Sequence, residues 1–277
     1  MRARVLGVAG VVALVLLSAV GAIGGLPAKV LAIAWVAFLA MVGGIVLGRH
    51  EAGGGHPVRL VWGYGLASGA MITSAAMFLV PEAIEHHAAF GGVGIAAGVV
   101  LGYSAHTVGH RLTHVESSFD SLSVRLSAHS LADGAVIGLV YAAVPALGPL
   151  LGLAIVSHKG PAGYASARSL AAEGRPVAPL LLPAAGVGIA AIPAALVDVP
   201  AVPWVNGLVF GFAAGVFLHV AMDFLPRCEV GGEIYDVAMT GGGGHALLDR
   251  LRVHAVASTA LGGAAVLAAW LAFGGAV

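Results

Sequence analysis

The stretch that decides the fold class spans residues 29–48 and reads KVLAIAWVAFLAMVGGIVLG, with Lys29 at its edge as the only charged residue. A helix of about 20 apolar residues crosses the hydrocarbon core of a bilayer, where backbone polar groups must be bonded within the segment. Residues 29–48 therefore predict a membrane-spanning helix.

The rest of the chain repeats this pattern. Hydrophobic residues make up 59% of the 277 residues and charged residues 9%, whereas soluble domains carry about 25% charged residues. The mean hydropathy is +0.99. Nine stretches are long and apolar enough to span: 5–26, 29–48, 60–81, 91–111, 122–143, 148–170, 177–197, 204–225 and 253–275. We expect an all-α integral membrane protein, a helical bundle surrounded by lipid.

Charge and cysteine content exclude several classes of protein. Basic and acidic residues number 13 each, so no basic face is expected to bind nucleic acid. Cys228 is the single cysteine, which excludes an internal disulfide framework and a Cys-rich zinc module. No Gly-rich loop ending in Lys-Ser or Lys-Thr is present, so we expect no ATP-driven step within this chain.

Basic residues indicate the orientation of the spans. With the N-terminus in the cytoplasm, all eleven arginines fall on the inner side and Lys29 alone on the outer side, while Lys159 lies within a span. Cytoplasmic loops carry an excess of Lys and Arg. The bias predicts a multi-pass protein of the cytoplasmic (plasma) membrane, with the C-terminus outside.

Residues 1–28 have two interpretations. The basic start, the apolar run and the small residues at 19–22 resemble a signal peptide, whose cleavage would leave eight spans. We favour retention as a ninth span, because the run is long and the cleavage pattern is weak.

Two neighbouring stretches carry polar residues at mid-depth, where charged groups need partners or a function. His129, Ser130 and Asp133 lie in the fifth stretch, and His129 and Asp133 are four residues apart on one helix face. His158 and Lys159 lie in the sixth, just before Pro161. Neutral imidazoles with a carboxylate suit Zn²⁺ and related ions. We expect His129, Ser130, Asp133 and His158 to bind a divalent metal ion.

Lys159 and Pro161 would modify such a site. A protonated lysine only donates hydrogen bonds, so Lys159 cannot bind a metal ion but can fill the place of a second one and neutralise Asp133. A plain structural ion pair is the alternative. Pro161 frees a backbone carbonyl of its helix. Met71 could add a thioether, although packing is the more usual role of methionine.

At these positions the chain resembles the ZIP family of zinc and iron transporters. The resemblance is to the branch whose metal helices read His-x-x-x-Asp-Gly and His-Lys-x-Pro-Ala, here His129 to Gly134 and His158 to Ala162. Residues 68–82, which end in Pro-Glu, resemble the second helix of the family, and residues 214–226 resemble its seventh. The resemblance covers about residues 30–275.

The resemblance implies eight family helices within residues 29–277, with residues 1–28 as an extra segment. It implies transport of Zn²⁺, with Fe²⁺, Mn²⁺ or Cd²⁺ as alternatives, toward the cytoplasm. Alternating access would follow an elevator-like movement, often in a homodimer. Lys159 stands where members with two ions have an acidic residue, Ala162 where many have Glu, and Ser130 where many have Asn. These departures imply a single-ion site.

Other imidazoles and carboxylates near the ends of the spans are candidates for the ion pathway, with polar edges or structural pairs as the alternative. At the outer end of the third stretch they are Glu82, Glu85 and His86; at the inner end of the fourth, His106, His110 and His114; in the eighth, His219 and Asp223.

Two other functions fit the same residues. A sensor or receptor would bind metal without moving it, which the missing carboxylate at Ala162 permits. A zinc-dependent intramembrane hydrolase would use zinc to activate water. The HExxH motif is absent, and no general base is evident beside a third ligand. We therefore expect no enzymatic activity.

Overall fold

The computed structural model describes residues 2–50, 57–112, 121–228, 234–235, 239 and 244–273, and these ranges contain helices and no strand. The helices are α1 (Arg2–Ile23), α2 (Ala28–His50), α3 (Pro57–Ser74), the π-helix η1 (Ala75–Leu79), α4 (Val80–Leu112), α5 (Ser121–Ala143), α6 (Pro149–Val156), α7 (Lys159–Ala172), the 3₁₀-helix η2 (Ala178–Leu180), α8 (Leu181–Ala194), α9 (Pro203–Asp223) and α11 (Gly244–Phe273).

The expected all-α fold is confirmed, and each predicted stretch coincides with one helix, with part of one, or with two or three consecutive ones. Within the described residues, six helical segments are long and apolar enough to cross a membrane. Several apolar helices therefore indicate a membrane-embedded, multi-pass chain.

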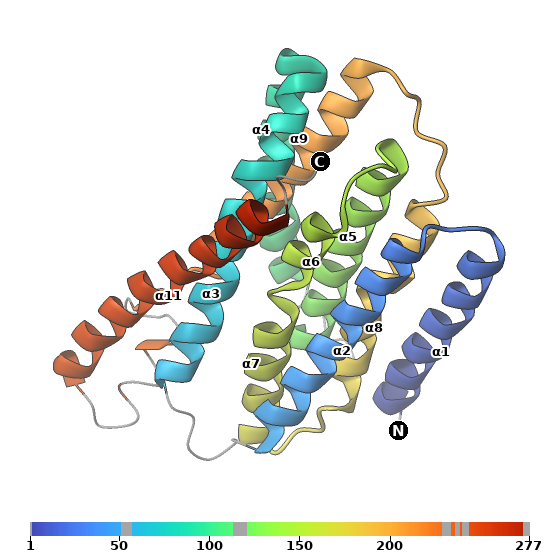
Figure 1. Ribbon diagram of the computed structural model, residues 1–277. Coiled ribbons are helices and arrows are strands. Elements are labelled where there is room, and N and C mark those ends of the chain that lie inside the picture. Colours follow the sequence, from blue (N-terminus) through green and yellow to red (C-terminus); the bar gives the residue numbers. More distant parts are fainter. Residues whose placement is uncertain are drawn as a thin grey trace.

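The helices form two groups (Figure 1). In one group, α3 runs beside α11 and α4 beside α9. In the other, α8 packs against α5, α1 and α2, while α2 also packs against α6 and α7. Contacts between the groups are less extensive and join α3 to α6 and α7, and α5 to α9. The residues of the candidate site lie in the second group, on the helices that meet this boundary.

The predicted stretch 148–170 is divided into α6 and α7, with a break at Ser157 and His158. Pro161 lies in the first turn of α7. It has no N–H to donate to the Ser157 carbonyl, so the helical hydrogen-bond ladder cannot continue there. The ladder resumes with Ala162 N–H donating to the His158 carbonyl at 3.0 Å. The break leaves His158 directly before the first residue of α7.

The third predicted stretch continues beyond residue 81, through η1 and the start of α4, and the chain turns at His87. His87 has extended backbone angles, φ −167° and ψ 100°. A Cβ on Gly91 would lie 2.5 Å from the Ala83 carbonyl oxygen, although eight residues of straight helix span about 12 Å. Residues 80–86 therefore prolong α3, and the rest of α4 returns beside α9.

Glycines allow the closest helix contacts. A Cβ placed on Gly98 of α4 would lie 2.3 Å from the Phe212 carbonyl oxygen. A Cβ placed on Gly215 of α9 would lie 2.2 Å from the Ile95 carbonyl oxygen. Any side chain there would push the two backbones apart. Small residues at helix contacts are typical of packing in lipid, where close backbone approach replaces the hydrophobic effect.

Lys29, the exception to the charge bias, has a structural role. Its ammonium donates to the Leu147 carbonyl at 2.6 Å and to the Pro145 carbonyl, and it lies 5.3 Å from the centre of the Tyr141 ring. Carbonyls just beyond a helix C-terminus attract a cation. The Tyr141 hydroxyl donates to the Gly148 carbonyl at 2.8 Å. These bonds hold the turn between α5 and α6, the two helices that lead to the candidate site.

Candidate metal site

The candidate site lies where α5 passes the break between α6 and α7. α5 contributes His129, Ser130 and Asp133, the break contributes His158, and Lys159 is the first residue of α7. The four-residue spacing places His129 and Asp133 on one face of α5, as expected. Because the α6–α7 break lies beside this face, residues 25 to 29 positions apart in the chain meet.

Three ligand atoms form a compact triangle. His129 Nε2 lies 3.3 Å from His158 Nε2, His158 Nε2 lies 3.1 Å from Asp133 Oδ2, and His129 Nε2 lies 3.4 Å from Asp133 Oδ2. Among the described residues, these side chains are the group of histidines, cysteines and acids whose atoms could hold a metal ion. The expected convergence of the two helices is confirmed.

The size of the triangle fits a first-row metal ion. Ligand atoms about 2.0–2.1 Å from a tetrahedral Zn²⁺ ion lie about 3.3–3.4 Å from one another. The three measured separations, 3.1–3.4 Å, are close to one face of such a tetrahedron. Three protein ligands leave a fourth position for water, so the ion could exchange. The triangle is compatible with Zn²⁺ but does not by itself select one metal.

Two of the three ligand side chains are buried. The Asp133 side chain is 1% exposed and that of His158 is 0% exposed, whereas His129 is 25% exposed. Asp133 Oδ1 is buried and has no hydrogen-bond partner among the residues that the structure describes. A buried carboxylate oxygen without a partner is costly, and a bound cation would compensate it.

Lys159 and Ser130 complete the polar cluster. The Lys159 ammonium, 2% exposed, donates to Asp133 Oδ2 at 2.5 Å and to the Ser130 hydroxyl at 3.2 Å. Ser130, predicted as a metal ligand, thus accepts a hydrogen bond from Lys159 in this structure. The predicted pairing of Lys159 with Asp133 is present. Ala162, also buried, brings no carboxylate to the cluster.

An aromatic residue that the sequence analysis missed covers the site from the other group of helices. The Phe224 ring, just after α9, lies 5.1 Å from the His158 ring and 6.3 Å from the His129 ring. Tyr64 of α3 supports it, with ring centres 5.6 Å apart. Nothing in the local sequence sets Phe224 apart from other apolar residues, since its contacts depend on how the two groups pack.

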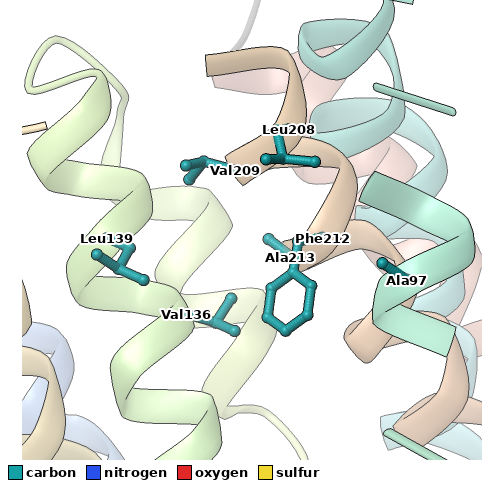
Figure 2. Close-up of a pocket in the computed structure, with 7 residues that line it drawn as sticks. All are labelled: Ala97, Val136, Leu139, Leu208, Val209, Phe212 and Ala213. Carbon is teal, nitrogen blue, oxygen red and sulfur yellow. The ribbon is translucent and has the colours of Figure 1, made fainter. Parts of the chain in front are cut away.

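The boundary between the two groups also contains an apolar pocket of about 280 Å³ (Figure 2). The Phe212 ring of α9 points into the space between α9 and α5. The lining residues are all apolar: Ala97, Val136, Leu139, Leu208, Val209, Phe212 and Ala213. The pocket has no group that could bind a cation, and it leaves an apolar space between α5 and α9.

Two of the other predicted modifiers have clear positions. Pro161 faces α3, where a Cβ on Gly63 would lie 3.6 Å from Pro161 Cβ. Met71 is fully buried within the main apolar core, in agreement with a packing role.

Four of the pathway candidates form two pairs outside the triangle. Glu82 Oε2 lies 3.5 Å from His86 Nε2, and the His86 ring stacks on Phe210. His219 Nε2 lies 3.5 Å from Asp223 Oδ2 near the end of α9. Each pair contains an imidazole and a carboxylate one helical turn apart.

The remaining candidates are not joined to these pairs. Glu85 is exposed on α4. His106 and His110 belong to the last turns of α4, but their side chains lie outside the described part, as does the whole of His114. The inner histidine face predicted for these three residues therefore stays a prediction.

The chain matches no protein-family model and no curated protein.

Proposed function

We propose that this protein is a transporter of divalent metal ions, with Zn²⁺ as the main substrate, and a member of the ZIP family. The observation that carries the proposal is the triangle of His129, Asp133 and His158, because its atoms lie at the spacing of three ligands of one ion. The motifs around these residues and the positions of the helices support the family assignment.

The proposed arrangement in the membrane follows from the helices and the charge bias. The two long parts of α3–α4, the pair α6–α7 and the pair η2–α8 each count as spans, together with α1, α2, α5, α9 and α11. This gives eight family helices after an extra first span, in the cytoplasmic membrane. The N-terminus then lies in the cytoplasm and the C-terminus outside.

The chemistry suits passage rather than permanent storage. Two imidazoles and one carboxylate bind Zn²⁺, Fe²⁺, Mn²⁺ or Cd²⁺, and the open fourth position lets water replace a ligand during release. A permanent structural zinc site would instead be closed by four protein ligands. The ion is the transported substrate, and the site holds one ion at a time.

The two groups of helices support alternating access. The site lies entirely on the group of α2 and α5–α8, while Phe224, which covers it, and Tyr64, which supports Phe224, belong to the group of α3 and α9. Sliding of one group against the other, along the boundary of α5 and α9, would open the site on either side. We further propose that the pair of Glu82 and His86 lies on the outer side and that of His219 and Asp223 on the inner side, with uptake toward the cytoplasm.

The test is uptake of radioactive Zn²⁺ into proteoliposomes containing the purified protein. His129→Ala removes one ligand and should lower the zinc affinity at least about 100-fold, since loss of even a residue that supports a ligand costs about 10–100-fold. His50→Ala, which removes an exposed imidazole at the end of α2, is the matched control and should leave uptake unchanged.

Three results would contradict the proposal in different ways. Equal uptake by the wild type and His129→Ala would remove the triangle from the mechanism. Zinc binding without uptake by the wild type would favour a sensor or receptor. The absence of both binding and uptake in a folded wild-type sample would exclude metal transport.

A further inference from the structure

Asp133 is the only acidic member of the ligand triangle, and it is already paired with a cation. The Lys159 ammonium lies 2.5 Å from Asp133 Oδ2, and the two side chains are 2% and 1% exposed. Water therefore contributes little to the stability of either charge. With neutral imidazoles, the cluster of Asp133, Lys159, His129 and His158 has no net charge when no metal is bound.

The position of the ammonium makes it a competitor of the metal ion. Lys159 Nζ approaches Oδ2, which is the carboxylate oxygen of the triangle. A metal ion that binds this oxygen comes close to the ammonium, and the repulsion between the two cations favours movement of the ammonium to another acceptor. The Ser130 hydroxyl, 3.2 Å away, and the unpartnered Asp133 Oδ1 offer the ammonium other acceptors nearby.

A transporter that alternates between two sides must also return empty. An unpaired buried carboxylate is strongly disfavoured in the interior of a membrane protein, and removing one partner of a buried pair leaves such a charge behind. The ion pair removes this obstacle only in the empty site, since in the loaded site the metal ion itself compensates Asp133.

We propose that Lys159 is the built-in counter-cation of the empty site, which pairs with Asp133 after the metal leaves and so permits the empty site to return. This inference rests on the proposed transport function. It assigns Lys159 a positioning and charge-compensating role, distinct from a ligand and from a purely structural ion pair.

Two kinds of flux separate these roles. Net uptake into zinc-free vesicles requires the return of the empty site in every cycle. Exchange of radioactive Zn²⁺ for unlabelled Zn²⁺ inside the vesicle requires movement of the loaded site alone. Without the Lys159 ammonium, the empty site carries a bare carboxylate, whereas the loaded site becomes less positive by one charge. Loss of Lys159 should therefore slow net uptake more than exchange.

The experiment compares both fluxes in proteoliposomes for the wild type and for Lys159→Met, which keeps the length of the side chain and removes its charge. The ratio of net uptake to exchange should fall at least about tenfold, as expected when a buried charge loses its partner. Lys159→Arg, which keeps the charge, should restore most of the ratio. Arg252→Met, which removes an exposed positive charge on α11, is the matched control and should leave the ratio unchanged.

The outcomes separate this inference from the proposed function. If net uptake and exchange fall equally in Lys159→Met, or if neither changes, Lys159 is not the counter-cation of the empty site, although transport stands. If the wild type shows neither flux, the proposed function fails. If Lys159→Met does not fold, Lys159→Gln, which keeps a donor for Asp133, tests the same ratio, and an unchanged ratio there overturns the inference.

Discussion

His129 is the member of the ligand triangle that keeps contact with the surface, with its side chain 25% exposed against 1% for Asp133 and 0% for His158. Its spacing from Asp133 could be predicted, because four residues make about one helical turn. The aromatic residue that lies over the site could not be predicted in this way. Phe224 follows α9, and Tyr64, which supports it, belongs to α3, so both take these positions only through the packing of separate helices.

Phe224 should control how fast a metal ion reaches the triangle. Phe224→Ala removes the ring that lies against His129 and His158, and we expect zinc to bind at least about twofold faster, with the number of ions bound unchanged. Aromatic contacts of this kind are worth about 0.5–1.5 kcal/mol, which corresponds to such a change in rate. Stopped-flow measurement of zinc binding in detergent gives the rate. Phe224→Leu, which keeps an apolar cover, should stay close to the wild type, and equal rates for all three proteins would show that Phe224 is not a barrier.

At the scale of the element, the break between α6 and α7 determines where His158 lies. Pro161 has no N–H to donate to the Ser157 carbonyl, so the helical hydrogen bonds are interrupted there, and α7 starts at Lys159. The motif indicated that Pro161 disturbs its helix, but not that one apolar stretch becomes two helices. The bend depends on Gly160 and Pro161 packing against α2 and α3 as well as on the missing N–H.

Pro161→Ala should therefore weaken metal binding without weakening the fold. The new N–H can donate to the Ser157 carbonyl, so α6 and α7 can join and carry His158 away from Asp133. We expect zinc affinity to fall about tenfold, or about 1.4 kcal/mol, with no loss of thermal stability. Isothermal titration calorimetry and thermal unfolding in detergent measure the two quantities.

Gly160→Ala is the matched control for this change. Its new Cβ would lie 3.6 Å from the nearest atom, the Ala40 carbonyl oxygen, so it fits without a clash. It keeps Pro161 and hence the break, and its zinc affinity should stay within about twofold of the wild type, a difference of about 0.4 kcal/mol. Unchanged affinity in Pro161→Ala would show that the bend does not position His158.

At the scale of the whole molecule, the site and its cover belong to different groups of helices (Figure 1). Gly63 of α3 and Pro161 of α7 lie on opposite sides of the boundary, with 3.6 Å between an ideal Gly63 Cβ and Pro161 Cβ. Disulfides join Cβ atoms about 3.5–4.5 Å apart, so this pair of positions suits a covalent link between the groups. Burial raises the pKa of the single native thiol, Cys228, which packs in an apolar cluster with residues of α3 and α11.

A disulfide between Gly63→Cys and Pro161→Cys, in a Cys228→Ser background, should stop zinc uptake if the two groups move during transport. Oxidised protein should lose at least about nine-tenths of its uptake, because the link holds one arrangement of the groups. Reduction should restore the uptake of the same sample, which controls for the loss of Pro161. Equal uptake before and after reduction, with the link confirmed by mass spectrometry, would exclude relative movement of α3 and α7.

The sequence alone determined the class of fold, the limits of most helices and the identity of the candidate ligands. These depend on properties of single segments: the length of an apolar run, the bonding of backbone groups within a helix, and the helical spacing that puts His129 and Asp133 on one face. Only the tertiary structure decided that His158 meets Asp133, that Lys159 and Ser130 join them, that the chain turns at His87, and that Phe224 covers the site. Each of these contacts depends on how separate helices pack, and side chains 25 or more residues apart leave no local periodicity that would reveal their distance.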